Sequence, residues 1–335
     1  MKRFLAKLLI FLSPFLVVVA LYFIKDPFKV LYHYKSYYEN GKPLYIVVNR
    51  DYVSKETFDN NYPKYNYDSY IFGNSRSGFY QVSEWQKHIN SVNTFHFDAS
   101  GESVYGIEKK LQYLDDKGAG ILNALFIMDA EILSQAENNK TYLYIKHPEL
   151  SGQSRLSYQF YFFKSYLDPA FLCAYLDFTI TGKVKPYMKE GNTIDDRILD
   201  YDLQHNEMYL GQFDEVILRN PDSFYLARKD IFYNRDTMNH HSPPVIKEKQ
   251  LILLNRIKQI LSIHHTNYKI VISPLYDQKK LNELDRQQLV KIFGSGNVFD
   301  FSGVNEITGN IRNYYEDSHY LPAVANKIMD SIYKF

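Results

Sequence analysis

From Asp68 onward, short apolar runs alternate with amphipathic stretches, and this alternation restricts the fold more than any other feature of the chain. The apolar runs are four to six residues long and are bounded by Gly, Asp, Asn or Pro. Such runs are typical of strands that are buried on both faces of a parallel sheet. The predicted strands are Ser69–Phe72, Thr94–Phe97, Ala124–Met128, Lys269–Ser273 and Val298–Phe301.

Helical patterns lie between these runs. They cover Val82–Ile89, Val104–Leu114, Lys247–Ile263, Leu281–Phe293 and Ala323–Tyr333. Strands that alternate with helices predict right-handed βαβ units. We therefore expect an α/β fold, with a doubly wound and mainly parallel five-stranded sheet.

Two segments depart from the alternation. Residues 26–66 are rich in Tyr, Asn and charge, with one strand-like piece at Leu44–Val48, and are predicted to be a linker that packs on the domain of residues 67–335. Residues 130–245 contain the aromatic stretch "LSYQFYFFKSYLDPAFLCAYL". They are too many for a plain loop, so they predict a helical insertion that caps the sheet.

The N-terminus has the pattern of a membrane anchor. Lys2, Arg3 and Lys7 precede or flank an apolar run from Leu8 to Ile24, which with the residues before it approaches the ~20 that a bilayer-spanning helix needs. No small-residue cleavage site follows, which favours an uncleaved single-pass anchor at residues 1–25. Basic residues ahead of the run favour a cytoplasmic N-terminus. The expected location is the cytoplasmic membrane, with the domain on the extracytoplasmic (periplasmic) side.

Composition excludes several classes of protein. A formal net charge of +1 and the absence of a Lys/Arg run argue against nucleic-acid binding. The single Cys173 cannot form an internal disulfide, and no CxxC or His/Cys cluster predicts structural zinc. The adjacent pairs His240–His241 and His264–His265 cannot share one helix face, so they are expected on the surface and not at a metal.

The stretch "YIFGNSRSGFY" sets Ser75 directly after the first predicted strand. Ligands of open α/β sheets collect at the carboxyl ends of the strands, near the point where the strand order reverses. Gly73 permits a tight turn, and the following helix directs free N–H groups towards the same edge. Ser75 is thus a candidate nucleophile, although a simple loop gives the same pattern.

Two further motifs are expected at the same edge of the predicted sheet. Gly101 lies in the turn after the second strand, where its amide can donate to an oxyanion, although Ser100 or Ser103 as a plain helix cap accounts for the turn equally well. A relay of acid and histidine is possible in "NYYEDSHY" before the last helix. The acids in question are Glu316 and Asp317, and the base is His319. A cluster of polar residues at the start of a helix is the alternative.

Together the three motifs resemble the SGNH/GDSL hydrolase superfamily, over Asp68 to Phe335 apart from the insertion. The resemblance implies a flavodoxin-like three-layer sandwich with Ser75 as nucleophile and His319 as base. It implies Asp317 or Glu316 as the acid, with the spacing of the alginate relatives slightly favouring Asp317. The amides of Ser75 and Gly101 would form the oxyanion hole, and no metal or organic cofactor is implied. Arg76 and Tyr320 flank these residues and are the expected substrate contacts.

Within that family, the anchor and the "DSHY" motif look most like envelope proteins of alginate O-acetylation and teichoic-acid D-alanylation. The resemblance implies an esterase or O-acyltransferase that acts on acyl, chiefly acetyl, esters of a cell-envelope glycan or another acylated polymer. A multispanning membrane acyltransferase is an expected partner. The chain departs from the family at two positions. Asn74 replaces the usual Asp, and Asp129 stands where an asparagine normally supports the oxyanion hole.

The second departure leaves two alternatives open. The domain can be a catalytically degenerate relative that binds a polymer or a membrane acyltransferase. It can also be an unrelated flavodoxin-like domain with a coincidental serine, in which case Ser75 and His319 would lie far apart.

Overall fold

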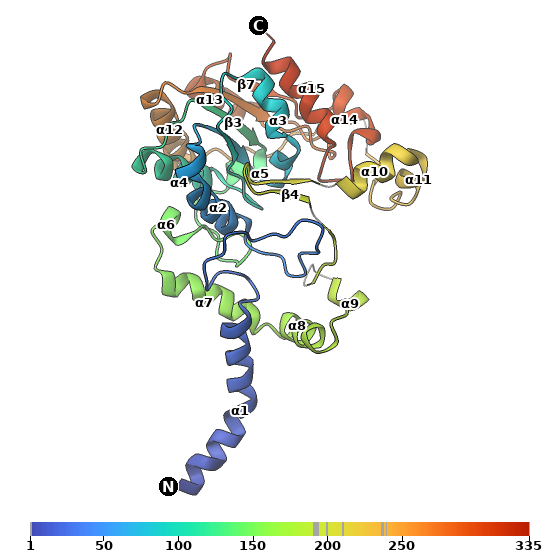
Figure 1. The fold of residues 1–335 in the computed structure, drawn as a ribbon. Coiled ribbons are helices and arrows are strands. Elements are labelled where there is room, and N and C mark those ends of the chain that lie inside the picture. Colours follow the sequence, from blue (N-terminus) through green and yellow to red (C-terminus); the bar gives the residue numbers. More distant parts are fainter. Residues whose placement is uncertain are drawn as a thin grey trace.

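A five-stranded, all-parallel sheet forms the centre of the protein, and helices cover both of its faces (Figure 1). The computed structural model describes residues 2–334 except 190–193, 199, 210, 236–237 and 239. The strand order is β2-β1-β3-β6-β7. The strands are β1 (Ser69–Gly73), β2 (Thr94–His96), β3 (Asn123–Met128), β6 (Asn267–Ile272) and β7 (Val298–Asp300). All five predicted strands are confirmed to within two residues at each end.

The chain crosses from β1 to β2 on one side and then returns to β3 on the other side of β1. This reversal makes the carboxyl end of β1 the switch point of the sheet, where ligands of such folds bind. Register pairs Gly73, the last residue of β1, with Ile127 of β3. Ser75 follows two residues later, so the topology puts it at this edge.

The two faces of the sheet have separate cores. Successive side chains of a strand point to opposite faces, so Tyr70 and Phe72 join one core and Ile71 joins the other. The first core packs against α4 (Val104–Asp116), α12 (Glu248–Ile263) and α13 (Glu283–Phe293). The second packs against α3 (Val82–Trp85) and α15 (Pro322–Ile332). These helices confirm the helical patterns read between the strands.

The segment 26–66 packs on the domain as predicted, but it is not a plain linker. It contains α2 (Arg50–Tyr65), whose Phe58 is fully buried in the first core beneath the sheet. Leu44–Val48 forms no strand. Asn49 caps α2 with its side-chain oxygen, which accepts a hydrogen bond from the Tyr52 amide, and its Nδ2 donates to the carbonyls of Tyr142 and Ile145.

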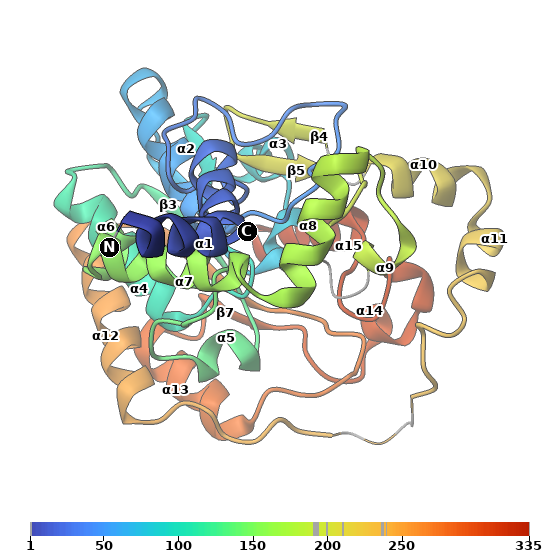
Figure 2. The same ribbon diagram turned by 90° about the horizontal axis from the view of Figure 1, so that it is seen from below.

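The insertion 130–245 divides into two parts. Its first part includes α7 (Arg155–Tyr166) and α8 (Pro169–Thr181), which pack with Tyr22 and Phe28 near the base of the N-terminal helix and not over the sheet (Figures 1 and 2). The second part carries the hairpin β4 (Asp200–Asp202) and β5 (Glu207–Tyr209), which the sequence did not predict.

The remaining elements are short or peripheral. They are η1 (Ser75–Phe79), η2 (Gln86–His88), α5 (Ala130–Ser134), α6 (Pro148–Ser151), α9 (Pro186–Lys189), α10 (Gly211–Arg219), α11 (Pro221–Leu226), α14 (Glu306–Gly309) and η4 (Ile311–Asn313). Helices α10 and α11 lie at the edge of the body beside α14 and α15 in both views (Figures 1 and 2).

The N-terminal helix α1 (Lys2–Lys25) projects from the body, away from the C-terminus (Figure 1). Large apolar side chains such as Ile10, Phe11 and Ile24 are more than 70% exposed on it. Within the described part of the chain, no helix has the length and apolarity required to cross a membrane. The expected membrane span is therefore not supported by this structure.

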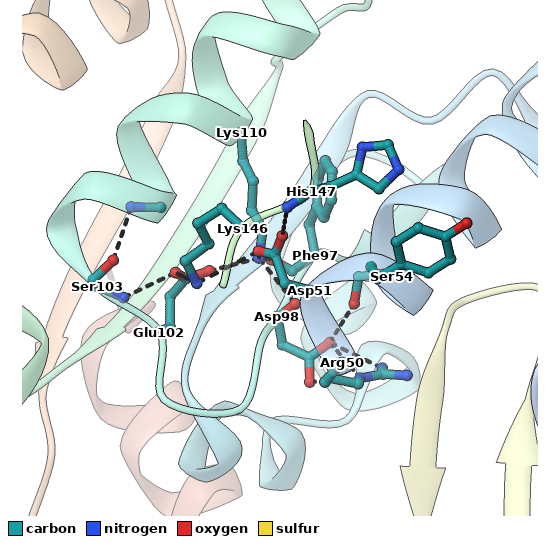
Figure 3. Close-up of polar contacts among 12 residues, drawn as sticks. Arg50, Asp51, Ser54, Phe97, Asp98, Glu102, Ser103, Lys110, Lys146 and His147 are labelled. Atoms are coloured by element: carbon teal, nitrogen blue, oxygen red, sulfur yellow. Dashed lines mark hydrogen bonds and ion pairs between the residues drawn. The ribbon is translucent and has the colours of Figure 1, made fainter. Parts of the chain in front are cut away.

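Four buried charges form a cluster that joins α2 and α4 (Figure 3). Lys110 Nζ lies 2.5 Å from Glu102 Oε2 and 3.3 Å from Asp51 Oδ2. Lys146 Nζ lies 2.6 Å from Glu102 Oε1 and 3.4 Å from Asp51 Oδ2. All four side chains are at most 2% exposed. Burial raises the pKa of Asp51, but the two lysines outweigh it, so that pKa lies below its usual value.

We predict that this cluster cannot lose one charge without a large loss of stability. Lys110→Met leaves two buried carboxylates with one cation, which should lower the free energy of unfolding by about 3–5 kcal/mol. Lys249 of α12 is paired with Glu137, both side chains are more than 70% exposed, and Lys249→Met should cost less than about 1 kcal/mol. Urea unfolding followed by the fluorescence of Trp85, the single tryptophan, measures both. Equal costs for the two variants would contradict the assignment.

Candidate active site

Ser75, His319 and Glu316 form a continuous hydrogen-bonded relay at the carboxyl edge of the sheet. Ser75 Oγ lies 2.8 Å from His319 Nε2, although the two residues are 244 positions apart in the chain. The other ring nitrogen, Nδ1, contacts Glu316 Oε1. Ser75 is exposed, whereas the side chains of His319 and Glu316 are each about 30% exposed. The group thus has the order of hydroxyl, imidazole and carboxylate that activates a serine.

The turn after β1 fixes the position of Ser75. Asn74 is the N-cap of η1, and its Oδ1 accepts a hydrogen bond of 3.0 Å from the Arg76 amide. Gly73 is required because a Cβ there would lie 2.7 Å from Ser77 Cβ and 2.8 Å from the Ile127 carbonyl oxygen. The Ser77 hydroxyl donates back to the Asn74 carbonyl at 2.7 Å, which closes the turn. Ser75 therefore lies on a short helical turn with little freedom to move.

The loop that carries His319 is held by its two neighbouring tyrosines. Tyr314 and Tyr320 form an antiparallel bridge, and the Tyr314 hydroxyl donates to the Pro274 carbonyl at 3.0 Å. Tyr320 is fully buried, with its hydroxyl 3.4 Å from Ser273 Oγ. The prediction that Tyr320 contacts substrate was wrong. Adjacent residues in extended backbone point to opposite sides, so Tyr320 faces the core while His319 faces the site.

The acid beside His319 is Glu316 and not Asp317, which the sequence slightly favoured. Asp317 is exposed, and Ser318 Oγ donates a hydrogen bond to it at 3.3 Å. Burial raises the pKa of Glu316, but His319 and the Ser318 amide, which donates at 2.8 Å, outweigh it and lower that pKa overall. Partial burial and the nearby Glu316 charge raise the pKa of Asp317. Glu316 is therefore the residue held in its ionised form against the imidazole.

Gly101 lies beside Ser75 and His319 on the wall of a polar cavity of about 280 Å³. Its φ of +57° is left-handed, and a Cβ would meet Tyr144 Cδ1 at 2.9 Å. The next residue, Glu102, belongs to the buried charge cluster, which fixes this turn. Among the described residues, the amides of Ser75 and Gly101 have no hydrogen-bond acceptor. Ser75 and Gly101 both line this cavity, so their amides are the candidate donors of an oxyanion hole.

Asp129, which stands where the SGNH resemblance leads us to expect an asparagine, is paired with a cation. Arg76 Nη1 lies 2.7 Å from its Oδ2, and Asn74 Nδ2 donates to the same oxygen at 2.9 Å. Its other oxygen caps α5 by accepting from the Ile132 amide. Arg76 also donates to the Ser318 carbonyl at 3.1 Å. The predicted substrate contact Arg76 thus ties the nucleophile turn to Asp129 and the histidine loop, while it lines the polar cavity as well.

A second, larger cavity of about 450 Å³ meets the first at Ser75 and His319. Its walls are mostly apolar and come from segments far apart in the chain, including α2, the end of β5 and helices α10 and α11. The lining side chains include Arg50, Met208, Phe213 and Arg228. The sequence pointed to none of them, because their elements lie in the supposed linker and in the insertion.

Asn139 is another residue that sequence reasoning passed over. It lines the polar cavity together with Ser75 and Gly101. Its Oδ1 accepts hydrogen bonds of 2.8 Å from the amide and the hydroxyl of Thr141. This orientation leaves Nδ2 as a donor, which is the chemistry that Asp129 cannot supply.

The described residues contain no group of three or more His, Cys, Asp or Glu side chains arranged to hold a metal ion. Comparison of the chain with family models, with curated proteins and with solved structures found no match in any of the three. Conclusions about the chemistry of this site therefore depend on its geometry.

We predict that Gly101 is required for its shape. Gly101→Ala and Gly118→Ala both place a side chain at positive φ, which costs roughly 1–2 kcal/mol. Only Gly101 has a neighbour, Tyr144, within 4 Å of the new Cβ, so its variant should lose about 1 kcal/mol more in urea unfolding. In a Tyr144→Ala background, where the ring is absent, adding Gly101→Ala should no longer produce this additional loss. If the two single variants are equally stable, the close approach of Tyr144 is not a constraint.

Proposed function

We propose that the chain is an SGNH-type serine esterase or O-acyltransferase that acts on acyl esters of a cell-envelope polysaccharide. The observation that carries the proposal is the relay Ser75–His319–Glu316, with 2.8 Å between Ser75 Oγ and His319 Nε2. The alternative of a coincidental serine expected these residues to lie far apart, and that expectation is wrong.

The relay supports a two-step acyl transfer. Ser75 Oγ attacks the carbonyl carbon of the ester while His319 Nε2 takes its proton, and Glu316 accepts a hydrogen bond from Nδ1–H of the resulting imidazolium. The amides of Ser75 and Gly101 donate to the oxygen that becomes negative. When the intermediate collapses, the C–O bond to the alcohol breaks, and the alcohol leaves with the proton from His319. The acyl group remains on Ser75.

The second step removes the acyl group from Ser75. A water molecule or a sugar hydroxyl gives its proton to His319 and attacks the acyl carbon. The bond between that carbon and Ser75 Oγ then breaks, and His319 returns the proton to Oγ, which yields an acid or a new ester and the free serine. Ser75 is exposed, so water can reach the acyl-enzyme when no acceptor is bound. Transfer requires an acceptor that covers the serine. The two cavities that meet at Ser75 offer room for an acyl donor on one side and an acceptor on the other.

Location and partners are part of the same proposal. Basic residues at the start of α1 and exposed apolar side chains along it support attachment to the cytoplasmic membrane, with the domain on the outer side. A multispanning acyltransferase that delivers acyl groups across the membrane fits a transferase of this kind.

A degenerate domain that only binds a polymer is the second candidate, because Asp129 replaces a donor of the oxyanion hole. Loss of one such donor typically costs ~10²–10³ in rate. The ion pair with Arg76 removes the repulsion that an isolated carboxylate would exert, and Asn139 offers another amide on the same cavity. Glycan binding without esterase activity, retained after loss of both Ser75 and His319, would favour this candidate.

A serine-reactive fluorophosphonate probe tests the nucleophile. We expect the purified protein to be labelled once, at Ser75, because His319 activates that hydroxyl alone. Ser75→Ala should abolish labelling. Ser100→Ala, which removes another serine from the wall of the larger cavity, should leave it intact. Absence of labelling in the unaltered protein, or labelling that persists in Ser75→Ala, would refute the proposal.

The choice of acid gives a separate prediction. Glu316→Gln should lower kcat for 4-nitrophenyl acetate by at least ~10² and by as much as ~10⁴, because the imidazolium loses its carboxylate. Asp317→Asn should stay within about threefold of the unaltered enzyme, since its carboxylate is exposed and has no contact with His319. The reverse order of the two effects would assign the role to Asp317.

A further inference from the structure

Helices α7 and α8 are apolar on two sides, although they lie at the surface of the protein (Figures 1 and 2). Helix α8 contains a single charged residue, Asp177, which pairs with Lys185 at 2.7 Å. A helix that is apolar on all sides normally lies in a protein core or in a membrane. Only one side of each helix is covered by the body of the protein. The buried side chains are Tyr158, Phe162 and Tyr166 of α7 and Phe171, Ala174 and Tyr175 of α8.

Each helix carries a second row of apolar residues on a different side. Both rows have the spacing i, i+4, i+7 and i+11, which places their members along one line of a helix. Leu156, Phe160 and Ile180 are 84%, 62% and 83% exposed. We call the two rows the outer stripes. They consist of Leu156, Phe160, Phe163 and Leu167 on α7, and of Pro169, Cys173, Leu176 and Ile180 on α8.

The outer stripes lie at the end of the body from which α1 projects. The Tyr166 hydroxyl donates to the Val18 carbonyl at 3.0 Å, and the ring centres of Phe163 and Tyr22 are 5.2 Å apart, so α7 packs against the base of α1. Figures 1 and 2 both show α7 and α8 beside this base. Because the buried sides of the two helices face the body, the outer stripes face away from it. They extend the apolar surface of α1, on which Ile24 is exposed, over the adjoining end of the body.

Basic side chains border the outer stripes. Lys164 of α7 is exposed, and so is Lys183, which directly follows the Gly182 that caps α8. Lysines at the edge of an apolar surface attract the negative headgroups of phospholipids, while their stems pack on apolar groups. Protein–protein interfaces, in contrast, are poor in lysine. An exposed apolar surface with this border, next to the helix proposed to enter a membrane, fits lipid better than it fits a protein.

We propose that α7 and α8 lie on the membrane surface, with their outer stripes between the lipid headgroups and the upper acyl chains. This contact is separate from α1 and holds the body in one orientation on the bilayer. Interfacial helices bind through the apolar area that they bury and through attraction to anionic lipids. The inference rests on the proposed attachment by α1, and it does not depend on the esterase chemistry.

A fluorophore on Cys173 tests the contact, because this residue is the single cysteine of the chain, is exposed and belongs to the outer stripe of α8. The full chain, labelled with nitrobenzoxadiazole, is placed in vesicles of phosphatidylcholine and phosphatidylglycerol without any other protein. Two matched labels are made in a Cys173→Ser background. One is Phe11→Cys on α1, and the other is Leu284→Cys, an exposed apolar position on α13 at the other end of the body (Figure 1). Aqueous iodide and nitroxide-bearing lipids are the two quenchers.

The labels at positions 173 and 11 should both be quenched by the nitroxide-bearing lipids. Iodide should quench them about fivefold less than the label at position 284, because an ion is excluded from the apolar layer.

Two double variants assign the contact to the outer stripes. Phe160→Ser with Ile180→Ser removes one exposed apolar side chain from each stripe, and it should raise iodide quenching of the Cys173 label about fivefold, to that of the label at position 284. Leu218→Ser with Leu226→Ser removes side chains that are 83% and 72% exposed from α10 and α11, outside the stripes. It should leave the Cys173 label unchanged.

A Cys173 label that iodide quenches, together with a label at position 11 that the lipids quench, would overturn the lipid contact and keep the attachment by α1. The outer stripes would then be a surface for a protein. If iodide quenches both labels fully, the attachment fails together with the inference. An equal response of the two double variants would also overturn the lipid contact. Fluorophosphonate labelling of Ser75 in the same variants reports separately on the esterase.

Discussion

The buried cluster of Asp51, Glu102, Lys110 and Lys146 is the constraint on which the rest of the molecule depends. Charges removed from water must be paired with good geometry, because a single loss leaves an uncompensated ion in the interior. Each ion comes from a different segment, so the cluster is satisfied only when all four segments are in place. The cluster also fixes the backbone position of the residues next to it in sequence. Gly101 precedes Glu102, and Arg50 precedes Asp51, so the pairing of four charges sets both the candidate oxyanion donor and the arginine of the larger cavity.

Within the site, the reactive groups and the rigid groups are neighbours in sequence. Ser75 lies between the capping residue Asn74 and Arg76, which is bound to Asp129. His319 precedes the buried Tyr320. In each case one side chain lines the cavity while the next is fixed in the core or in an ion pair. This arrangement brings an exposed serine and a partly exposed histidine within hydrogen-bond distance.

The sequence was sufficient to predict the strands of the sheet and most residues of the relay. Prediction failed for elements whose buried side chains are polar. The five strands are continuous apolar runs, because both faces of each strand are covered, and such runs are visible without a structure. Helix α2 was missed because its buried face includes Arg50, Asp51, Ser54 and Lys55, so no apolar period appears in "RDYVSKETFDNNYPKY". The hairpin β4–β5 was missed because it is short and flanked by polar residues. The choice between Glu316 and Asp317 depends on how one loop turns, which spacing alone does not determine.

The place of α2 has a practical meaning for anyone who wishes to work with the domain by itself. Judged from the first strand, residue 67 looks like a natural start, since the sheet and the whole relay follow it. A protein that begins there would lack Arg50, whose guanidinium pairs with Asp98. It would also lack Asp51, whose carboxylate pairs with two buried lysines. It would also expose the first core, on the face of the sheet against which Phe58 packs. The smallest autonomous unit must begin upstream of Asn49, in the stretch that joins α1 to α2.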